Sequence, residues 1–162
     1  MGLMIRPATA DDRPAIAGII LPVIRAGDTY TLPSDMTAEA ALSYWLAPDH
    51  EVFVACENGQ ILGTYYLRPN QRGGGSHVAN CGYMTASGAE GRGVGRAMCQ
   101  HSMAHAADRG YRAMQFNFVV STNERAVRLW RDYGFEIVGR LPGAFKHPTA
   151  GYVDAYVMFR PL

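Results

Sequence analysis

The sequence has little of what marks a nucleic-acid-binding, membrane or secreted protein. Its net charge is only +1, and this balance gives no broad basic field for nucleic acid or an anionic membrane. No apolar run reaches the length of a membrane span, and the N-terminus lacks the apolar core of a signal peptide. We therefore expect a cytoplasmic protein with neither nucleic acid nor a membrane as a partner.

Cysteines and metal-ligand clusters are also scarce. The three cysteines are Cys56, Cys81 and Cys99, and their odd number and wide spacing favour reduced, buried thiols over a disulfide framework. His101 and His105 have the i, i+4 spacing of a helical metal site, but no acidic residue lies between them and no third ligand is evident. We therefore expect no metal ion.

The composition suits one small domain. The chain has 162 residues, of which 48% are hydrophobic, enough for a single domain over residues 1–162 with its own core. Strand-like and helix-like patterns alternate along it. This order predicts an α/β fold, in which a sheet of about six or seven strands carries helices on both faces.

The expected elements follow from periodicity and from turn and capping residues. Asn58-Gly59 favours a tight hairpin, Pro22 indicates a kink or break in the first helix, and Ser121 opens a capping box. Residues 142–148 are expected to form a loop that could close over a bound molecule. The last strand is expected to be an exposed edge of the sheet, which could support a homodimer. Strands are expected at 3–7, 51–56, 61–68, 78–85, 112–118, 135–139 and 152–159, and helices after Thr9 and Thr37, over 94–108 and over 121–133.

The segment Gly91-Arg92-Gly93-Val94-Gly95-Arg96 lies between an expected strand and an expected helix. Glycines let backbone N–H groups turn inward, and a helix N-terminus adds free donors and partial positive charge, so this segment predicts a cradle for a phosphorylated ligand. A P-loop would need Lys followed by Ser or Thr, and a dinucleotide fingerprint would need its third glycine at position 96 or 98. The sequence has neither.

A second segment, Asn123–Glu136, reads N-E-R-A-V-R-L-W-R-D-Y-G-F-E. Together with G-x-G-x-G followed by Arg, it resembles the GNAT acyl-CoA N-acyltransferases, whose later helix usually reads N-x-x-A-x-x-L-Y-x-x-x-G-F. The resemblance covers roughly residues 4–159. It implies the GNAT fold, a mixed twisted sheet splayed between its two central parallel strands, and acetyl-CoA as the cosubstrate.

The resemblance also places acetyl-CoA on particular residues. Its pantetheine arm would follow backbone groups of the splayed strand, and its pyrophosphate would meet N–H groups of the glycine segment. Asn123 would lie near the CoA sulfur or the pantetheine amide, and packing at a helix N-terminus capped by Ser121 is its other interpretation. The expected cofactor-binding residues are Tyr83, Met84, Thr85, Gly91, Arg92, Gly93, Val94, Gly95, Arg96 and Asn123.

Two residues depart from the family pattern. Trp130 stands where a Tyr often protonates the CoA thiolate, and an indole is no acid at neutral pH. Tyr133 is the candidate substitute, although packing in the core also explains it. Glu90 stands where Arg or Gln often opens the pyrophosphate loop. Because that loop binds the pyrophosphate mainly through its backbone, we expect Glu90 to have only a small effect on the affinity for acetyl-CoA.

Two asparagines inside expected strands, Asn80 and Asn117, join Asn123 and Tyr133 as candidate catalytic residues. Asn is unfavourable inside strands, and burying its amide without a hydrogen-bond partner costs free energy. Each asparagine therefore predicts a hydrogen bond to a polar substrate or to an attacking water. A bulge, or a side-chain bond to neighbouring backbone, is the alternative. V-A-N-C-G-Y, Q-F-N-F-V-V-S-T-N-E-R-A-V and the tail L-P-G-A-F-K-H-P-T-A-G-Y-V-D-A together resemble a GNAT subgroup that includes fungal N-acetyltransferases of azetidine-2-carboxylate and proline analogues. That resemblance implies that the two asparagines contact an amino-acid substrate and a catalytic water.

The rest of the acceptor site is expected from aromatic residues that could shape a small apolar slot, and from a histidine that titrates near neutrality. Ordinary core packing is the alternative for the aromatic residues, and a surface loop is the alternative for the histidine. The candidate substrate-binding residues are Tyr30, Asn80, Tyr83, Asn117, Phe118, Phe145 and His147.

The expected function is an acetyl-CoA-dependent N-acetyltransferase acting on a small-molecule amine, with amino acids and cyclic imino acids as candidate acceptors. The amine would attack directly in a ternary complex, with the backbone N–H of Met84 or Thr85 stabilising the oxyanion and a base acting directly or through one water. Two alternatives stay open. One is N-terminal acetylation of proteins or peptides, which would want an open groove, and the other is a non-catalytic acyl-CoA-binding regulator, indicated only by Trp130.

Overall fold

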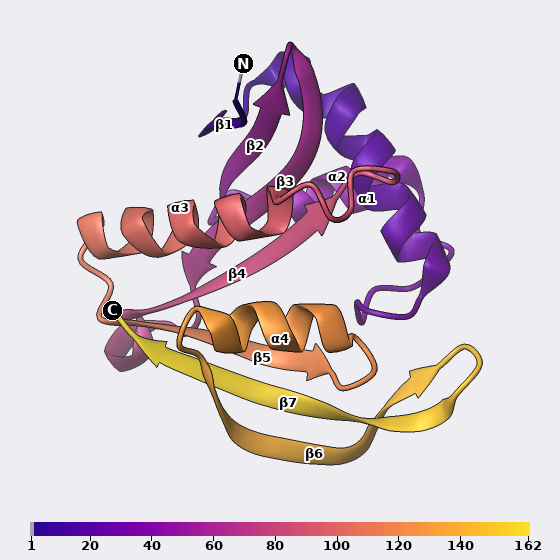
Figure 1. The fold of residues 1–162 in the computed structure, drawn as a ribbon, viewed down its shortest axis with the longest axis vertical. Helices are drawn as coiled ribbons and strands as arrows, with labels where there is room; N and C mark the ends of the chain where they lie inside the picture. Colours follow the sequence, from indigo (N-terminus) through magenta and orange to yellow (C-terminus); the bar gives the residue numbers. More distant parts are fainter. Residues whose placement is uncertain (1) are drawn as a thin grey trace.

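Seven strands form one mixed sheet in the order β1-β2-β3-β4-β5-β7-β6 (Figure 1). The computed structural model describes residues 2–162, and within them β4 and β5 are the only parallel neighbours. The expected mixed α/β sheet is therefore confirmed. The strands are β1 (Met4–Pro7), β2 (Glu51–Glu57), β3 (Gln60–Pro69), β4 (Val78–Thr85), β5 (Ala113–Val120), β6 (Glu136–His147) and β7 (Gly151–Pro161).

Helices cover both faces of the sheet. Two lie on one face, α1 (Arg13–Ala26) and α2 (Ala38–Trp45), and two on the other, α3 (Val94–Asp108) and α4 (Glu124–Asp132) (Figure 1). Short 3₁₀ turns at Ala10–Asp12 and Gly73–Gly75 precede α1 and β4. Within residues 2–162, no helix has both the length and the apolar character needed to cross a bilayer.

Each face of the sheet has its own core. On one face, Ile16 and Ile20 of α1 and Trp45 of α2 are fully buried. On the other face, Met98 of α3 and Met114 of β5 are fully buried. α3 lies so close to β3 that a Cβ on Gly63 would come within 2.7 Å of the Val94 side chain. A glycine at position 63 thus lets the helix settle against the sheet.

Local sequence signals predicted several elements correctly. β4 and α3 have the expected bounds. Asn58 and Gly59 both have positive φ, at 51° and 78°, as a tight hairpin turn requires. Thr37 caps α2, because its hydroxyl accepts a hydrogen bond from the Ala40 N–H at 3.0 Å. Short-range turn and capping chemistry decided each of these boundaries.

Pro22 does not break the first helix. α1 continues through it to Ala26. The helix buries Ile16, Ile19 and Ile20 before the proline and Ile24 after it, so packing on the sheet holds both halves in place. This burial outweighs the single backbone hydrogen bond that a proline removes.

The expected loop over residues 142–148 is wrong. Most of it belongs to β6, which pairs with β7 as far as His147 opposite Gly151. The register shifts between Leu141 and Phe145, so Pro142 lies at an irregularity where a ladder donor is not required. β7 is also not an edge strand, since it lies between β5 and β6. The edge predicted to support a homodimer therefore belongs to β6, and the dimer itself stays a prediction.

The predicted cap of α4 is also wrong. The Ser121 N–H still donates to the Asp154 carbonyl at 2.9 Å, so this residue remains tied to β7. Asn123 is the N-cap instead, with its Oδ1 accepting the Ala126 N–H at 3.4 Å. Sheet pairing thus moves the helix start two residues later.

Candidate active site

β4 and β5 diverge almost as soon as they meet. They pair at Val78 with Ala113 and at Ala79 with Met114, and beyond these pairs they separate into a wedge (Figure 1). The expected splay between the two central parallel strands is confirmed. Backbone groups of β4 beyond Ala79 have no strand partner on this side, so they are open to a ligand.

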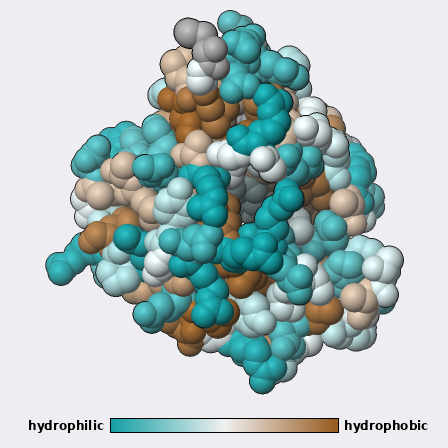
Figure 2. Space-filling model, in the orientation of Figure 1, coloured by the Kyte–Doolittle hydropathy of each residue, from teal (hydrophilic) through white to brown (hydrophobic). Residues whose placement is uncertain are grey.

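A cavity of about 540 Å³ opens on one side of the wedge, between the β4–α3 loop and α4. Figure 2 shows a recess near the middle of this face, rimmed largely by hydrophilic residues. Among the expected cofactor-binding residues, those that line it are Tyr83, Thr85, Gly91, Gly93, Val94, Gly95, Arg96 and Asn123.

The glycine segment shapes this cavity as an anion site. Gly91 and Gly93 have φ values of 76° and 81°, which only glycine adopts readily. The Ala97 N–H donates to the Gly93 carbonyl and makes the first hydrogen bond of α3, so the N–H groups of Val94, Gly95 and Arg96 precede the helical ladder. A phosphate placed there would accept hydrogen bonds from these N–H groups and lie at the positive end of the helix dipole.

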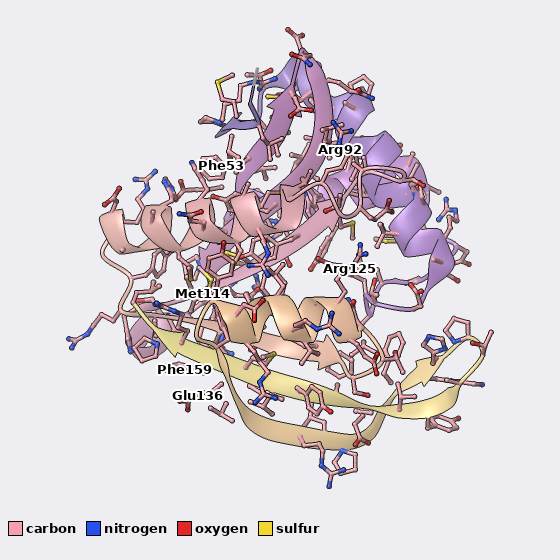
Figure 3. All side chains as sticks on the ribbon, in the orientation of Figure 1. Phe53, Arg92, Met114, Arg125, Glu136 and Phe159 are labelled. Atoms are coloured by element: carbon pink, nitrogen blue, oxygen red, sulfur yellow. The ribbon has the colours of Figure 1, made fainter. Side chains whose placement is uncertain are left out.

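Charged side chains surround the same cavity. Figure 3 shows Arg92 in the β4–α3 loop and Arg125 at the start of α4. Arg92 pairs with Glu57 at 2.6 Å and does not line the cavity. Arg125 and Arg128 line it, and neither has an ion-pair partner within residues 2–162. Two free guanidinium groups thus favour a polyanionic ligand.

Glu90 also lines this cavity. Its Oε2 accepts the Gly88 N–H at 2.8 Å, which folds the carboxylate back into its own loop. Arg96 is similarly engaged, with Asp132 at 2.6 Å.

A second cavity, of about 340 Å³, lies within the wedge and reaches toward α1 and the loop that follows it. The two cavities share five lining residues: Tyr83, Thr85, Asn123, Ala126 and Trp130. The Trp130 indole is 8% exposed and packs against Tyr83 and Phe116, with ring centroids 4.9 and 4.7 Å apart. A ligand in the first cavity can therefore present its end to a molecule in the second.

Comparison with known proteins identifies this arrangement. The model of the acetyltransferase (GNAT) family matches residues 23–135. The chain belongs to this family. It is therefore an acyltransferase, and its expected GNAT fold is confirmed.

Two curated relatives are similar over most of the chain. N-acetyltransferase aca1 of Schizosaccharomyces pombe is 28% identical over 151 residues, covering 83% of this chain and 72% of the relative. L-amino acid N-acetyltransferase AaaT of Escherichia coli is 32% identical over 114 residues, covering 70% and 69% respectively.

Solved structures share the whole fold. A GCN5-related N-acetyltransferase from Kribbella flavida has a TM-score of 0.95 and 44% identity, covering 99% of this chain and 98% of that one. The yncA protein of Salmonella typhimurium, solved with its cofactor acetyl-CoA, has a TM-score of 0.87 at 20% identity, covering 100% of this chain and 95% of that one. The glycine cradle, its free donors and the adjoining arginines fit acetyl-CoA as the cosubstrate of this GNAT enzyme.

Asn80 lies where β4 leaves β5. It is 6% exposed, and its Nδ2 donates to the Gln115 carbonyl at 2.9 Å, while its Oδ1 accepts Arg68 Nε at 3.3 Å. The bond to β5 backbone spans the apex of the wedge, beyond the last strand pair. Asn80 also lines the second cavity, so its side chain combines a structural bond with exposure to a ligand.

Asn117 lies at an irregularity in β5. The register against β7 shifts between Phe116 and Val119, and such bulges re-aim side chains next to active sites. Its Nδ2 donates to Asn70 Oδ1 at 2.7 Å, and its Oδ1 accepts Gln115 Nε2 at 2.9 Å. Asn117 lines the second cavity and is exposed.

The other candidates divide into residues at the wedge and residues outside it. Asn123 and Trp130 line both cavities, whereas Tyr133 lines neither and ends α4, where its carbonyl accepts Arg160 Nε at 2.6 Å. His147 also lines neither: its Nδ1 accepts the backbone N–H groups of Thr149 and Ala150 at 3.2 and 3.1 Å. That ring therefore holds the β6–β7 turn.

The aromatic candidates surround the second cavity from different elements. Tyr30, Tyr83 and Phe118 line it, as does Met84. The Tyr30 hydroxyl donates to the Tyr83 carbonyl at 3.0 Å, which ties the segment after α1 to the splayed strand. Phe145 packs beside Phe118 at 6.2 Å between ring centroids and faces a separate surface hollow that also includes Tyr30.

No side chain lining the second cavity within residues 2–162 is an Asp, Glu, His or Lys. Burial raises the pKa of Tyr30, Tyr66 and Tyr83 above that of a free phenol. Burial also raises the pKa of the Cys81 thiol to about 12, so this cysteine stays protonated and is no nucleophile. An acceptor amine would therefore lose its proton to water rather than to a side chain of this cavity.

The two histidines of α3 have partners of their own. His101 Nδ1 bonds the Tyr65 hydroxyl at 2.7 Å, and His105 Nε2 bonds Glu51 Oε2 at 2.8 Å. Within residues 2–162, no cluster of His, Cys, Asp and Glu has the geometry of a metal site. All three cysteines are free and buried.

Sequence reasoning missed several residues at the wedge. Arg68 lies near the end of β3, Asn70 directly follows that strand, and Gln115 lies in β5; all three bond to the candidate asparagines. Polar residues near the end of an apolar strand gave a weak signal for Arg68 and Asn70. Arg125 and Arg128 were visible in the second motif, but only the structure shows that both face the glycine cradle.

Proposed function

We propose that this GNAT enzyme transfers the acetyl group of acetyl-CoA to the amine of a small molecule, an amino acid or cyclic imino acid. The transfer occurs by direct attack in a ternary complex. The observation that carries this proposal is the pair of cavities that meet at the β4–β5 wedge. A cavity of about 340 Å³ suits a small acceptor.

The relatives support the same class of acceptor. The E. coli relative is an L-amino acid N-acetyltransferase, and its similarity spans 70% of this chain. Amino acids are compact amines that fit the second cavity. Small changes in lining residues alter the acceptor of a shared fold, so the acceptor panel distinguishes individual amino acids.

The chain's own groups would divide the work around the wedge. Acetyl-CoA supplies the activated acyl group when it is bound. The N–H of Thr85, which the β3–β4 register points away from β3 and into the wedge, would stabilise negative charge on the acyl oxygen, whereas the N–H of Met84 points to β3. Asn80 and Asn117 would orient the amine and a water that takes its proton. Trp130 lines both cavities but cannot protonate the departing thiolate, so a water would supply that proton while the Asn123 amide hydrogen-bonds the sulfur.

Thiol release from acetyl-CoA, followed against a panel of amines, tests the proposal. The panel contains azetidine-2-carboxylate, proline analogues, primary amino acids, polyamines and short peptides. Release with amino or imino acids supports the proposed acceptor class. Release with peptides alone would instead assign N-terminal acetylation, since β6 replaces the loop expected to close the site. Release with none, despite acetyl-CoA binding, would contradict small-amine transfer.

The pH dependence of kcat/KM should follow the acceptor amine. The second cavity is the acceptor cavity of this proposal. Because no Asp, Glu, His or Lys lines it within residues 2–162, the reactive neutral amine must form by loss of its proton to water. We expect kcat/KM to rise with pH to a midpoint that differs between L-leucine and the less basic L-leucinamide. A midpoint shared by both acceptors would indicate a titrating enzyme group and contradict this expectation.

A further inference from the structure

Arg68 is the only charged residue among those lining the acceptor cavity within residues 2–162. It lies in β3, opposite Asn80 of β4 in the sheet register, and is half-buried. No acidic side chain within residues 2–162 forms an ion pair with it. Burying an unpaired guanidinium in a small cavity costs free energy unless water or a ligand accepts its hydrogen bonds.

The guanidinium is held from one side only. Its Nε donates to Asn80 Oδ1 at 3.3 Å, and Asn80 in turn donates to the Gln115 carbonyl at 2.9 Å. This chain of bonds links Arg68 to both β4 and β5 at the apex of the wedge. The two terminal nitrogens have no hydrogen-bond partner within residues 2–162, and they present the planar fork that suits a carboxylate.

The position of Arg68 separates the acceptor from acetyl-CoA. Side chains two residues apart share one face of a strand. Tyr66 and Met84 pack in the core under α1 and α2, so Arg68 of β3 and Asn80 of β4 lie on that face too. That face is covered by α1 and α2, whereas the glycine cradle lies on the α3 and α4 side. A group bound by Arg68 would thus lie across the wedge from the pyrophosphate.

We propose that Arg68 forms a carboxylate-binding subsite, so that this enzyme selects amines that carry a carboxylate. The proposal rests on the proposed function and deepens it. An amino acid reacts as the neutral amine, and in that form its net charge is −1, which one guanidinium compensates. The same positive charge disfavours an ammonium ion nearby and so favours the reactive form of the amine.

The test compares two acceptors that differ in the carboxylate, L-leucine and L-leucinamide. For Arg68→Gln we expect kcat/KM with L-leucine to fall by roughly 10- to 100-fold, the worth of a charge-assisted hydrogen-bonded pair. Turnover of L-leucinamide should fall by no more than a few-fold, because the substitution also removes the neutral-partner bond from Arg68 Nε to Asn80 Oδ1, and affinity for acetyl-CoA should be unchanged. The amide is the less basic amine, so basicity alone would favour it, and a wild-type preference for the acid reports recognition.

Arg72→Gln is the matched control. It removes the same charge from an exposed side chain four residues away that does not line the cavity, and we expect wild-type behaviour. Retention of the preference for L-leucine in Arg68→Gln would overturn the subsite. So would an equal loss of turnover with L-leucinamide, since that would indicate general damage to the site.

Calorimetry with N-acetyl-L-leucine and CoA keeps this proposal separate from the proposed function. If no panel amine is acetylated, yet N-acetyl-L-leucine binds to the wild type and weakly to Arg68→Gln, the subsite stands and the proposed transfer fails. If amines are acetylated without preference for the carboxylate and N-acetyl-L-leucine binds both proteins alike, the transfer stands and the subsite fails.

Discussion

Gly93→Asp should abolish useful binding of acetyl-CoA. Gly93 has a φ of 81°, lines the first cavity and accepts the first hydrogen bond of α3 through its carbonyl. An aspartate there would place a carboxylate where the pyrophosphate meets the helix N-terminus. Like charges about 4 Å apart repel by about 4 kcal/mol at an effective dielectric constant near 20, so we expect affinity to fall by roughly 10³-fold. Calorimetry with acetyl-CoA measures this loss.

Gly110→Asp is the control for backbone strain and added charge. Gly110 follows the other end of α3 and has a φ of 89°, and a Cβ added to it would have no neighbouring atom within 4 Å, as is true of Gly93. Both substitutions therefore strain a turn with positive φ where the added side chain has space. Only Gly93→Asp places its carboxylate in the proposed pyrophosphate site. Undiminished binding by Gly93→Asp, or equal loss in a folded Gly110→Asp, would sink the assignment of the pyrophosphate loop.

The parts of the fold predicted correctly are those decided by short stretches of chain. The bounds of β4 and α3 follow from the glycines between them, and the β2–β3 turn from Asn58-Gly59. The errors arose where pairing with a distant strand overrode a local signal. Ser121 bonds Asp154 and so cannot begin α4, and pairing with β7 extends β6 past Pro142 and Gly143.

The site divides in the same way. The glycine cradle and the asparagines could be predicted because each is visible within a few residues. Arg68 was missed because its relation to Asn80 depends on the register of β3 against β4, which one sequence does not display. Tyr133 was proposed from its helical spacing to Trp130, but it ends α4 away from both cavities. Spacing along a helix therefore predicted the neighbourhood and not the direction of the side chain.

Asn117→Ala should lower turnover far more than it lowers affinity for acetyl-CoA. Asn117 lines the acceptor cavity and not the cradle, so the cosubstrate site should stay intact. If its amide orients the amine or the water that takes the proton, its loss removes a positioned proton-transfer step, worth about 10²-fold in kcat. Single-turnover thiol release and calorimetry with acetyl-CoA measure the two quantities separately.

The hydrogen bond to Asn70 supplies the control. Asn70 is 9% exposed, and its Oδ1 accepts the Asn117 Nδ2 at 2.7 Å. Asn70→Ala removes that bond but leaves the Asn117 amide in the cavity, so we expect only a few-fold loss of kcat, as for a neutral hydrogen bond. Normal turnover in Asn117→Ala would exclude this residue from the mechanism. A loss in Asn70→Ala as large as in Asn117→Ala would mean that Asn117 acts only by holding the bulge of β5, because deleting either partner breaks the same bond.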